Sequence, residues 1–124
     1  MKKILLVEDD PILQKTLGLA LEQESYEVKS ALDGEIGIRT AKEEKPDLIL
    51  LDLILPKYDG FEVLAELKKD ETTKEIPVIV LTNLETSEDI QKALALGATT
   101  YLVKANYDLK DVLEKVKDNI KTKN

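Results

Sequence analysis

The sequence predicts an open, doubly wound α/β sheet of five parallel strands, covered on both faces by five helices. Five short apolar runs recur along the chain, and stretches whose apolar residues repeat every three to four positions lie between them. That alternation is typical of a parallel sheet whose strands are joined by helices. A chain of 124 residues, 43% apolar and 35% charged, has the size and composition of one domain, which we expect to span residues 1–124.

The expected strands are apolar runs with the usual length of strands in globular proteins. In chain order they are ILLV (4–7), YEV (26–28), LILL (48–51), VIVL (78–81) and YLV (101–103). Because right-handed crossovers join them, the most economical strand order is 2-1-3-4-5, which is a flavodoxin-like sheet. In such a sheet the ligand site lies beyond the carboxyl ends of the strands.

The helices are predicted from amphipathic repeats and from residues that favour helix ends. Asp10, a capping residue, precedes Pro11, which suits a first turn, and an apolar repeat follows up to Leu21. A second helix is expected at about residues 34–44, although two glycines weaken it. Asp33-Gly34 and Asp59-Gly60 mark turns or helix starts, Ser87 opens another helix and Gly97 suits a helix end. The repeat from Leu109 to Ile120 predicts a last amphipathic helix.

Composition excludes several classes of function. The chain has no cysteine and no histidine, which removes disulfides, thiolate zinc sites, cysteine nucleophiles and serine–histidine catalysis. A net charge of −7, from 18 basic and 25 acidic residues, argues against a nucleic-acid partner. Every apolar run is far shorter than the roughly 20 residues that cross a bilayer, so we expect a cytoplasmic protein without a membrane partner.

Polar side chains follow four of the expected strands, at the edge where the carboxyl ends of parallel strands meet. They are Glu8, Asp9 and Asp10 after the first strand, Asp52 after the third, Thr82 after the fourth and Lys104 after the fifth. The turn after the first strand is acidic and has no glycine, which excludes the glycine-rich phosphate cradle of nucleotide-binding sheets. Clustered carboxylates repel by about 4 kcal/mol per pair at about 4 Å with an effective dielectric constant of about 20, so a cation is required.

Lys104 supplies one positive charge, and we expect a hard divalent cation with oxygen ligands, Mg²⁺ or Mn²⁺, to supply the rest. With that charge in place a carboxylate accepts a phosphoryl group, because the cations stabilise the transferred oxygens. Asp52 follows the central strand and is the predicted acceptor. The Thr82 hydroxyl is predicted to donate a hydrogen bond to a phosphoryl oxygen. Asp10 is interpreted as a helix cap and not as a ligand, because Pro11 follows it.

Four segments carry a resemblance, over nearly the whole chain, to the response-regulator receiver domains of two-component signalling, including the stand-alone chemotaxis-type members. They are ILLVEDD (4–10), PDLILLDLILPKYDG (46–60), IPVIVLT (76–82) and YLVK (101–104). The resemblance implies that Asp52 is the phosphoacceptor and that Lys104 contacts the phosphoryl group. It also implies that Thr82 and Tyr101 are switch residues.

The same resemblance implies the ligands of the divalent cation. They are Asp9, Asp52 and the backbone carbonyl of Ile54, with Glu8 acting through a water molecule. Receivers usually carry a proline directly after the lysine, often with a cis peptide bond, whereas Ala105 follows the lysine here. Without proline a cis bond costs about 2.5 to 4 kcal/mol, so we expect a trans bond.

The resemblance implies a phosphoprotein of a phosphorelay, phosphorylated by a sensor histidine kinase or a phosphotransfer protein. Phosphorylation is expected to change a surface at about residues 86–120 that binds a downstream protein target, in a monomer or weak dimer. Such a domain is not an enzyme, although it assists its own phosphorylation and dephosphorylation. The alternative is a pseudo-receiver that binds proteins without phosphorylation, for which Ala105 and Asn83 are the evidence. A phosphatase with an aspartate nucleophile needs a second acid where Ile54 stands, and the acidic first turn disfavours a flavin-binding module.

Overall fold

The computed structural model describes residues 1–121, which hold a sheet of five parallel strands. The strands are β1 (Lys3–Val7), β2 (Glu27–Ala31), β3 (Leu48–Leu51), β4 (Val78–Thr82) and β5 (Thr100–Val103). They lie in the order β2-β1-β3-β4-β5, and each neighbouring pair is parallel. The predicted fold class and strand order are confirmed, while residues 122–124 of the expected domain lie outside the described part of the chain.

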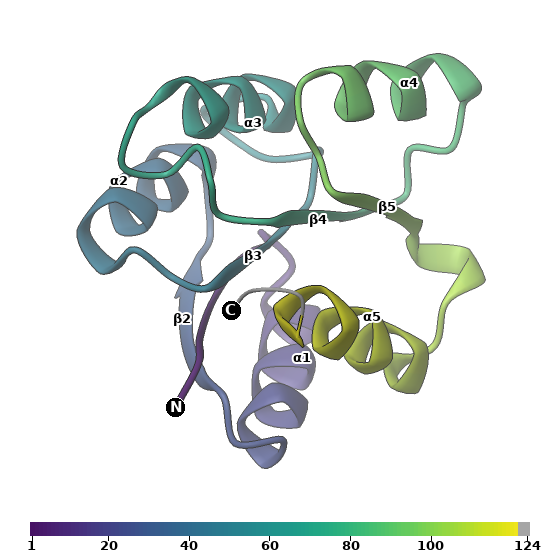
Figure 1. Cartoon of the computed structure of the whole chain (residues 1–124). Coiled ribbons are helices and arrows are strands. Elements are labelled where there is room, and N and C mark those ends of the chain that lie inside the picture. The colour runs from purple at the N-terminus through teal and green to yellow at the C-terminus, as the bar shows by residue number, and fades with distance from the viewer. Residues whose placement is uncertain (122–124) are drawn as a thin grey trace.

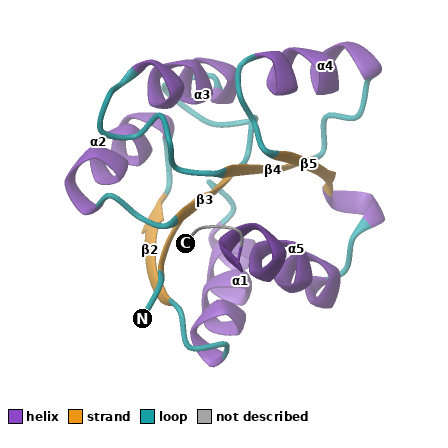
Figure 2. Cartoon of the chain, in the orientation of Figure 1, coloured by secondary structure: helices purple, strands orange, loops and turns teal. Residues whose placement is uncertain are grey.

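Five α-helices of the described residues cover the two faces of the sheet (Figures 1 and 2). They are α1 (Pro11–Gln23), α2 (Gly34–Glu44), α3 (Gly60–Lys69), α4 (Ser87–Ala95) and α5 (Leu109–Lys121). Figure 1 shows α2, α3 and α4 on one side of the sheet and α1 and α5 on the other. The side chains of Asp10, Asp33 and Asp59 cap the first three helices, as the sequence indicated for the aspartates that precede Pro11, Gly34 and Gly60.

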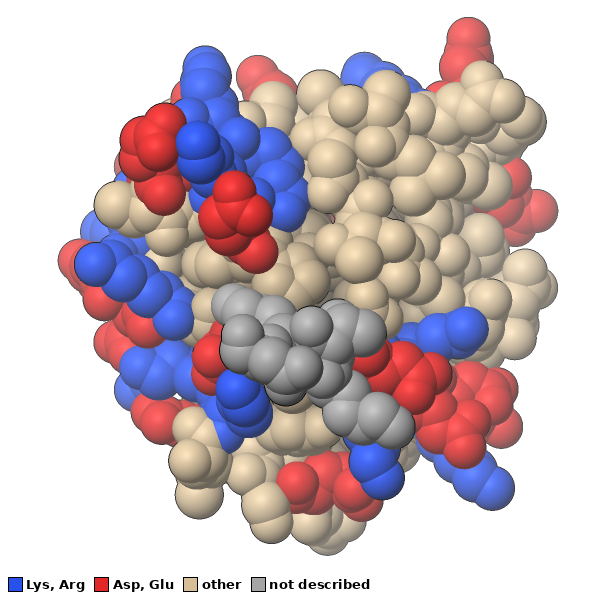
Figure 3. Space-filling view, viewed as in Figure 1, with Lys and Arg blue, Asp and Glu red and all other residues tan. Residues whose placement is uncertain are grey.

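Charged groups of both signs lie over part of the molecular face that Figure 3 shows. On the face that Figure 3 shows, Lys and Arg groups are interspersed with Asp and Glu groups, and an uncharged area lies over α4 and its surroundings. None of the helices within residues 1–121 combines the length and the apolar character that a membrane span requires.

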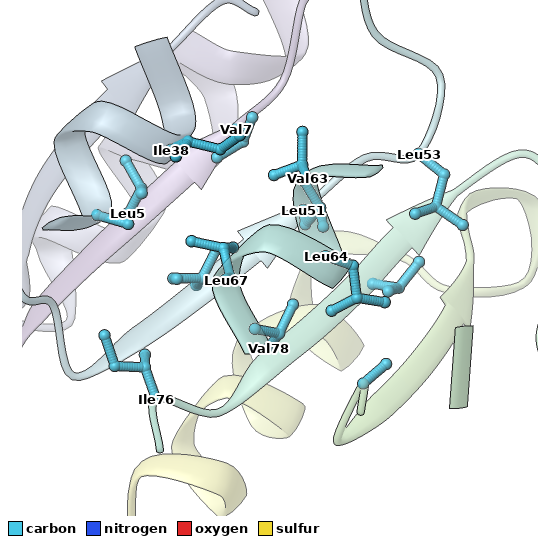
Figure 4. Packing of buried hydrophobic residues seen from close by; sticks show 14 of the residues in the cluster. Leu5, Val7, Ile38, Leu51, Leu53, Val63, Leu64, Leu67, Ile76 and Val78 are labelled. Carbon is cyan, nitrogen blue, oxygen red and sulfur yellow. The ribbon is translucent and has the colours of Figure 1, made fainter. Parts of the chain in front are cut away.

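The core has two layers, because successive residues of each central strand point to opposite faces of the sheet. Figure 4 shows the layer beneath α2 and α3, where Leu5, Val7, Leu51 and Val78 of the strands pack with helix residues such as Leu64. The layer beneath α1 and α5 contains Ile4, Leu6, Leu48, Leu50, Leu17, Leu21, Val112 and Val116. Because all neighbouring strands between these two layers are parallel, their carboxyl ends meet at one edge of the sheet.

The structure differs from the expected elements in two places. The second strand covers Glu27–Ala31 and not residues 26–28, because β2 is an edge strand of mostly exposed or half-buried residues and carries little apolar signal. A short 3₁₀-helix (Lys104–Asn106) follows β5, which the sequence did not indicate. The peptide bonds of the described residues are all trans, including the bond before Ala105, as expected without a proline.

Candidate functional site

Three carboxylates converge at the carboxyl end of the sheet. Glu8 and Asp9 follow β1, and Asp52 follows the neighbouring strand β3. One oxygen atom from each carboxylate lies within 4.8 Å of the other two. Glu8 is only 2% exposed and Asp52 only 5%, whereas Asp9 is exposed to solvent. Burial strengthens the mutual repulsion of these charges, so the cluster needs positive charge nearby.

Lys104 provides that charge from the end of β5. Its Nζ lies 2.9 Å from Glu8 Oε1 and 2.9 Å from Asp52 Oδ2, and the lysine side chain is 18% exposed. Burial by itself lowers the pKa of Lys104, but the hydrogen bonds to Asp52 and Glu8, together with the negative charges of these two acids, outweigh burial, and the pKa is raised overall. Lys104 is therefore a firmly charged bridge between two buried carboxylates.

Glu8 is held in an environment that disfavours its ionised form. Burial raises the pKa of Glu8 above the ordinary carboxyl value, and the hydrogen bonds from Lys104 and from the Asp10 backbone N–H offset burial only in part. The negative charge of Asp52 raises the pKa further. The ionised form of Glu8 is therefore a source of instability in the metal-free protein at neutral pH.

We expect Glu8→Gln to raise the free energy of unfolding of the metal-free protein at pH 7, because the variant no longer buries an ionised carboxylate beside Asp52. A group whose folded pKa is raised stabilises most below its unfolded pKa and loses that contribution as the pH rises through the folded value. The advantage of the variant should therefore shrink as the pH falls from neutral toward the ordinary carboxyl pKa. Urea unfolding of both proteins in a chelator, over a pH series, measures this difference.

The exposed Glu22 offers a matched control on α1. Glu22→Gln should change the free energy of unfolding by less than about 0.5 kcal/mol at each pH. A Glu8→Gln variant that is less stable than the wild type at pH 7 would show that the ion pair with Lys104 outweighs burial.

The residues beside the cluster are placed by local backbone hydrogen bonds. Asp52 Oδ1 accepts a hydrogen bond from the Ile54 N–H at 3.1 Å, so the backbone of the loop after β3 lies against the acceptor carboxylate. The Ile54 side chain is 50% exposed. Asp10 Oδ1 instead accepts from the Ile12 N–H at 3.0 Å and caps α1, which confirms its interpretation as a cap.

Thr82 and Tyr101 both contact the loop between β4 and α4. Thr82 is fully buried at the end of β4, next to β3, and its Oγ1 accepts a long hydrogen bond of 3.5 Å from the Leu84 N–H. The Tyr101 hydroxyl donates to the Leu84 carbonyl at 2.8 Å. Leu84 thus connects a hydroxyl near the acidic cluster to an aromatic residue of β5.

The donor set fits a hard divalent cation. The carboxylates of Glu8, Asp9 and Asp52 offer oxygen atoms only, which Mg²⁺ and Mn²⁺ prefer to softer ligands. A single lysine faces three acids within this cluster, so negative charge remains in excess. The chemistry of these residues therefore agrees with the predicted Mg²⁺ or Mn²⁺ site.

Two residues near the site were missed by reasoning from the sequence. Gln14 on α1 donates from Nε2 to the carbonyls of Glu8 and Ala31, at 3.0 and 3.1 Å. Lys57, in the loop after β3, has a φ of 70° and forms ion pairs of 3.7 and 3.6 Å with acids at the start of α2. Neither residue belongs to a local pattern, because their partners are brought near only by the packing of helices on the sheet.

Comparison with known proteins links this geometry to a family. The family model of the response regulator receiver domain matches residues 4–117. The DNA-binding dual master transcriptional regulator RpaA of Synechocystis sp. is 41% identical over 117 residues, which are 94% of this chain and 48% of RpaA. The chain spans about half the length of RpaA and of other similar curated regulators.

Solved structures agree in fold and include metal-bound proteins. The receiver domain of the sensor histidine kinase PA1611 from Pseudomonas aeruginosa, with a magnesium ion coordinated in its active-site cleft, has a TM-score of 0.87 and 30% identity. The match covers 96% of this chain and 97% of that one. The Mn²⁺-bound form of the response regulator Rcp1 has a TM-score of 0.81 and 36% identity, over 95% of this chain and 91% of Rcp1.

Proposed function

This chain belongs to the response regulator receiver domain family of two-component signalling, and on that premise we propose that it accepts a phosphoryl group on Asp52. The donor is a sensor histidine kinase or a phosphotransfer protein. The observation that carries the proposal is the contact of Lys104 with both Glu8 and Asp52, at 2.9 Å each, within a cluster of three carboxylates. A buried aspartate beside a lysine and two further acids suits the transfer of a highly charged group.

In the proposed transfer, a carboxylate oxygen of Asp52 forms a bond to phosphorus while the bond from phosphorus to a histidine nitrogen of the donor breaks. The nitrogen keeps the electron pair of that bond, and the product is an aspartyl phosphate. Asp52 Oδ2 contacts Lys104 and Oδ1 accepts from the Ile54 N–H, so both oxygens are oriented before the reaction. Lys104 then stabilises charge on the phosphoryl group, because its ammonium already lies beside the acceptor.

The proposed metal ligands are Asp9, Asp52 and the backbone carbonyl of Ile54, with Glu8 acting through water, and the ion is Mg²⁺ or alternatively Mn²⁺. The all-oxygen donor set and the excess of negative charge support this assignment. When bound, the ion neutralises the cluster and stabilises negative charge on the phosphoryl oxygens. Within residues 1–121, Lys104 supplies the positive charge in contact with the cluster, through Glu8 and Asp52.

Phosphorylation is proposed to act on a surface at about residues 86–120 through Thr82 and Tyr101. A hydrogen bond from the Thr82 hydroxyl to a phosphoryl oxygen competes with its long contact to the Leu84 N–H. Movement of Leu84 in turn changes the partner of the Tyr101 hydroxyl. The surface is proposed to exist in an inactive and an active form. To shift it from mostly inactive to mostly active, new bonds must stabilise the active form by several kcal/mol.

The proposed partners are a phosphodonor protein and a downstream protein target, with the chain as a monomer or weak dimer. We propose no nucleic-acid contact by these residues, because the net charge is −7 and basic groups are interspersed with acidic ones on the face in Figure 3. The relative RpaA is named as DNA-binding, but it is about twice as long as the region that it shares with this chain.

The acceptor role of Asp52 is tested with acetyl phosphate and Mg²⁺. Intact-mass spectrometry is expected to find one phosphoryl adduct on the wild-type protein and none on Asp52→Asn. Asp10→Asn is the matched control, since asparagine caps a helix as well as aspartate does and Asp10 lies outside the three-acid cluster. An adduct on Asp52→Asn contradicts the assignment, and a wild-type protein without any adduct supports a pseudo-receiver.

The switching role is tested by amide hydrogen exchange on protein kept phosphorylated by excess acetyl phosphate. Protection is expected to change across residues 82–105, which contain Thr82, Leu84 and Tyr101. Helix α2 packs against β1, β2 and α3, away from residues 82–105, and should keep its protection. Identical exchange across residues 82–105 in phosphorylated wild type and in treated Asp52→Asn would rule the switch out.

A further inference from the structure

The β1–β2 ladder ends just where the acidic cluster begins. Residues Val7 and Ala31 are the last paired positions, and the Glu8 N–H still donates to the Ala31 carbonyl at 3.0 Å. The register of the ladder, in which Glu27 donates to the Lys2 carbonyl, makes residue 33 the next backbone donor for the Glu8 carbonyl. Asp33 instead caps α2, where its side chain accepts from the Ile36 N–H.

The side chain of Gln14 provides a donor at this point. Its Nε2 donates to the Glu8 carbonyl at 3.0 Å and to the Ala31 carbonyl at 3.1 Å, so both amide hydrogens are used. Both partners are pure acceptors, which defines the orientation of the amide group without ambiguity. Gln14 therefore extends the hydrogen bonding between β1 and β2 by one step, from the first turns of α1.

The backbone that Gln14 holds carries the buried acid of the cluster. Glu8 is 2% exposed and its two carboxylate oxygens are engaged by Lys104 Nζ at 2.9 Å and by the Asp10 N–H at 3.1 Å. Burial makes the ionised carboxylate costly at this place, so the side chain needs a well-fixed backbone to remain there. A bond to the Glu8 carbonyl restrains that backbone directly.

We propose that Gln14 is a positioning residue of the metal site, which holds the backbone at Glu8, next to Asp9, in place and so sets the affinity for Mg²⁺. This inference rests on the proposed function. Gln14 Nε2 donates to the backbone carbonyl of Glu8 and not to a carboxylate, so its effect on the cluster passes through that backbone carbonyl. Residues that orient metal ligands in this way typically change metal affinity by about tenfold or more when they are replaced.

Gln14→Met keeps the length of the side chain and removes both donors. The dissociation constant for Mg²⁺, measured by NMR titration of the Asp9 and Asp52 amides, is expected to rise about tenfold. The rate of phosphorylation by acetyl phosphate at saturating Mg²⁺ is expected to stay within about twofold of the wild type, because the acceptor is unchanged. Gln23→Met, at the exposed end of the same helix, is the matched control and should leave both quantities unchanged.

A dissociation constant within about twofold of the wild type overturns the proposal. A lower maximal rate with unchanged affinity overturns it as well, since Gln14 then acts on the chemistry and not on the metal. A wild-type protein that shows no response to Mg²⁺ overturns the proposed function itself, so the two failures are distinguishable.

The wild-type chain offers a second test that needs no variant to fold. Because coupling between two sites is reciprocal, Mg²⁺ binding must strengthen a hydrogen bond that strengthens Mg²⁺ binding. Exchange of the Gln14 side-chain amide hydrogens with solvent is therefore expected to slow when Mg²⁺ is added. Unchanged exchange in protein whose Asp9 and Asp52 amides respond to Mg²⁺ contradicts the proposal.

Discussion

Lys104→Met is expected to lower the free energy of unfolding of the metal-free protein by about 3 kcal/mol, measured by urea unfolding in a chelator. The lysine bridges Glu8 and Asp52, which are 2% and 5% exposed. Methionine retains much of the side-chain volume, so the loss comes from two buried carboxylates that have no compensating cation. Removal of one partner from a buried ion pair is far more destabilising than loss of an exposed pair.

Mg²⁺ should reverse much of this loss, because a divalent cation bound to the cluster replaces the missing charge. At a concentration of about 100 times the dissociation constant, a ligand that binds only the folded state stabilises it by about 2.7 kcal/mol. The variant should also bind Mg²⁺ more tightly than the wild type, since the ion no longer meets the repulsion of an ammonium group.

Lys110→Met is the control for this experiment, because Lys110 is exposed on α5. It should change the free energy of unfolding by less than about 0.5 kcal/mol, with or without Mg²⁺. If Lys104→Met is as stable as the wild type in the chelator, the two buried carboxylates do not depend on the lysine. The electrostatic account of the site would then be wrong.

Gly60→Ala is expected to destabilise the protein by about 3 kcal/mol or more, measured by urea unfolding. A Cβ at position 60 would lie 2.7 Å from both the carbonyl carbon and the carbonyl oxygen of Leu53, which belong to the backbone and cannot rotate away. Gly60 also donates its N–H to that carbonyl at 3.0 Å, so the contact closes the loop between β3 and α3. The substitution should also weaken Mg²⁺ binding, because this loop carries Asp52 and Ile54 at its start.

Gly18→Ala is the matched control, since the same atom is added at a glycine with room for it. The nearest atom to a Cβ at position 18 is Val28 Cγ1 at 3.9 Å, an ordinary van der Waals distance. Gly18 lies inside α1, where alanine is preferred to glycine by about 0.5 to 1 kcal/mol, so this variant should be more stable than the wild type. Equal effects of the two substitutions would contradict the steric account of Gly60.

The succession of elements and the residues at their carboxyl ends could be predicted because their signals are local. Four apolar residues in a row at Leu48–Leu51 predict a strand covered on both faces, and the structure shows all four buried. Asp52, directly after them, is an acid at the end of a buried strand and is therefore recognisable from the sequence. Asp10 before Pro11 indicates a helix start without reference to any distant residue. The bounds of the edge strand β2 were predicted less well, because its mostly exposed or half-buried residues carry little of the apolar pattern on which the prediction relies.

The contacts that organise the site depend on the tertiary structure. Lys104 reaches Asp52 across 52 positions of sequence, and Gln14 reaches the Ala31 carbonyl across 17. The packing of the helices on the sheet determines which donor and acceptor atoms form these hydrogen bonds. No periodic pattern in the sequence contains that information.

The sequence by itself determined the fold class, the strand order and the four strand ends at which polar groups gather, because each depends on the hydrophobicity and geometry of neighbouring residues. The tertiary structure alone decided that Lys104 joins two buried acids, that Gln14 supports Glu8 and that Leu84 connects Thr82 to Tyr101. These contacts join residues of different elements, and their distances are determined only when both layers of the core are packed.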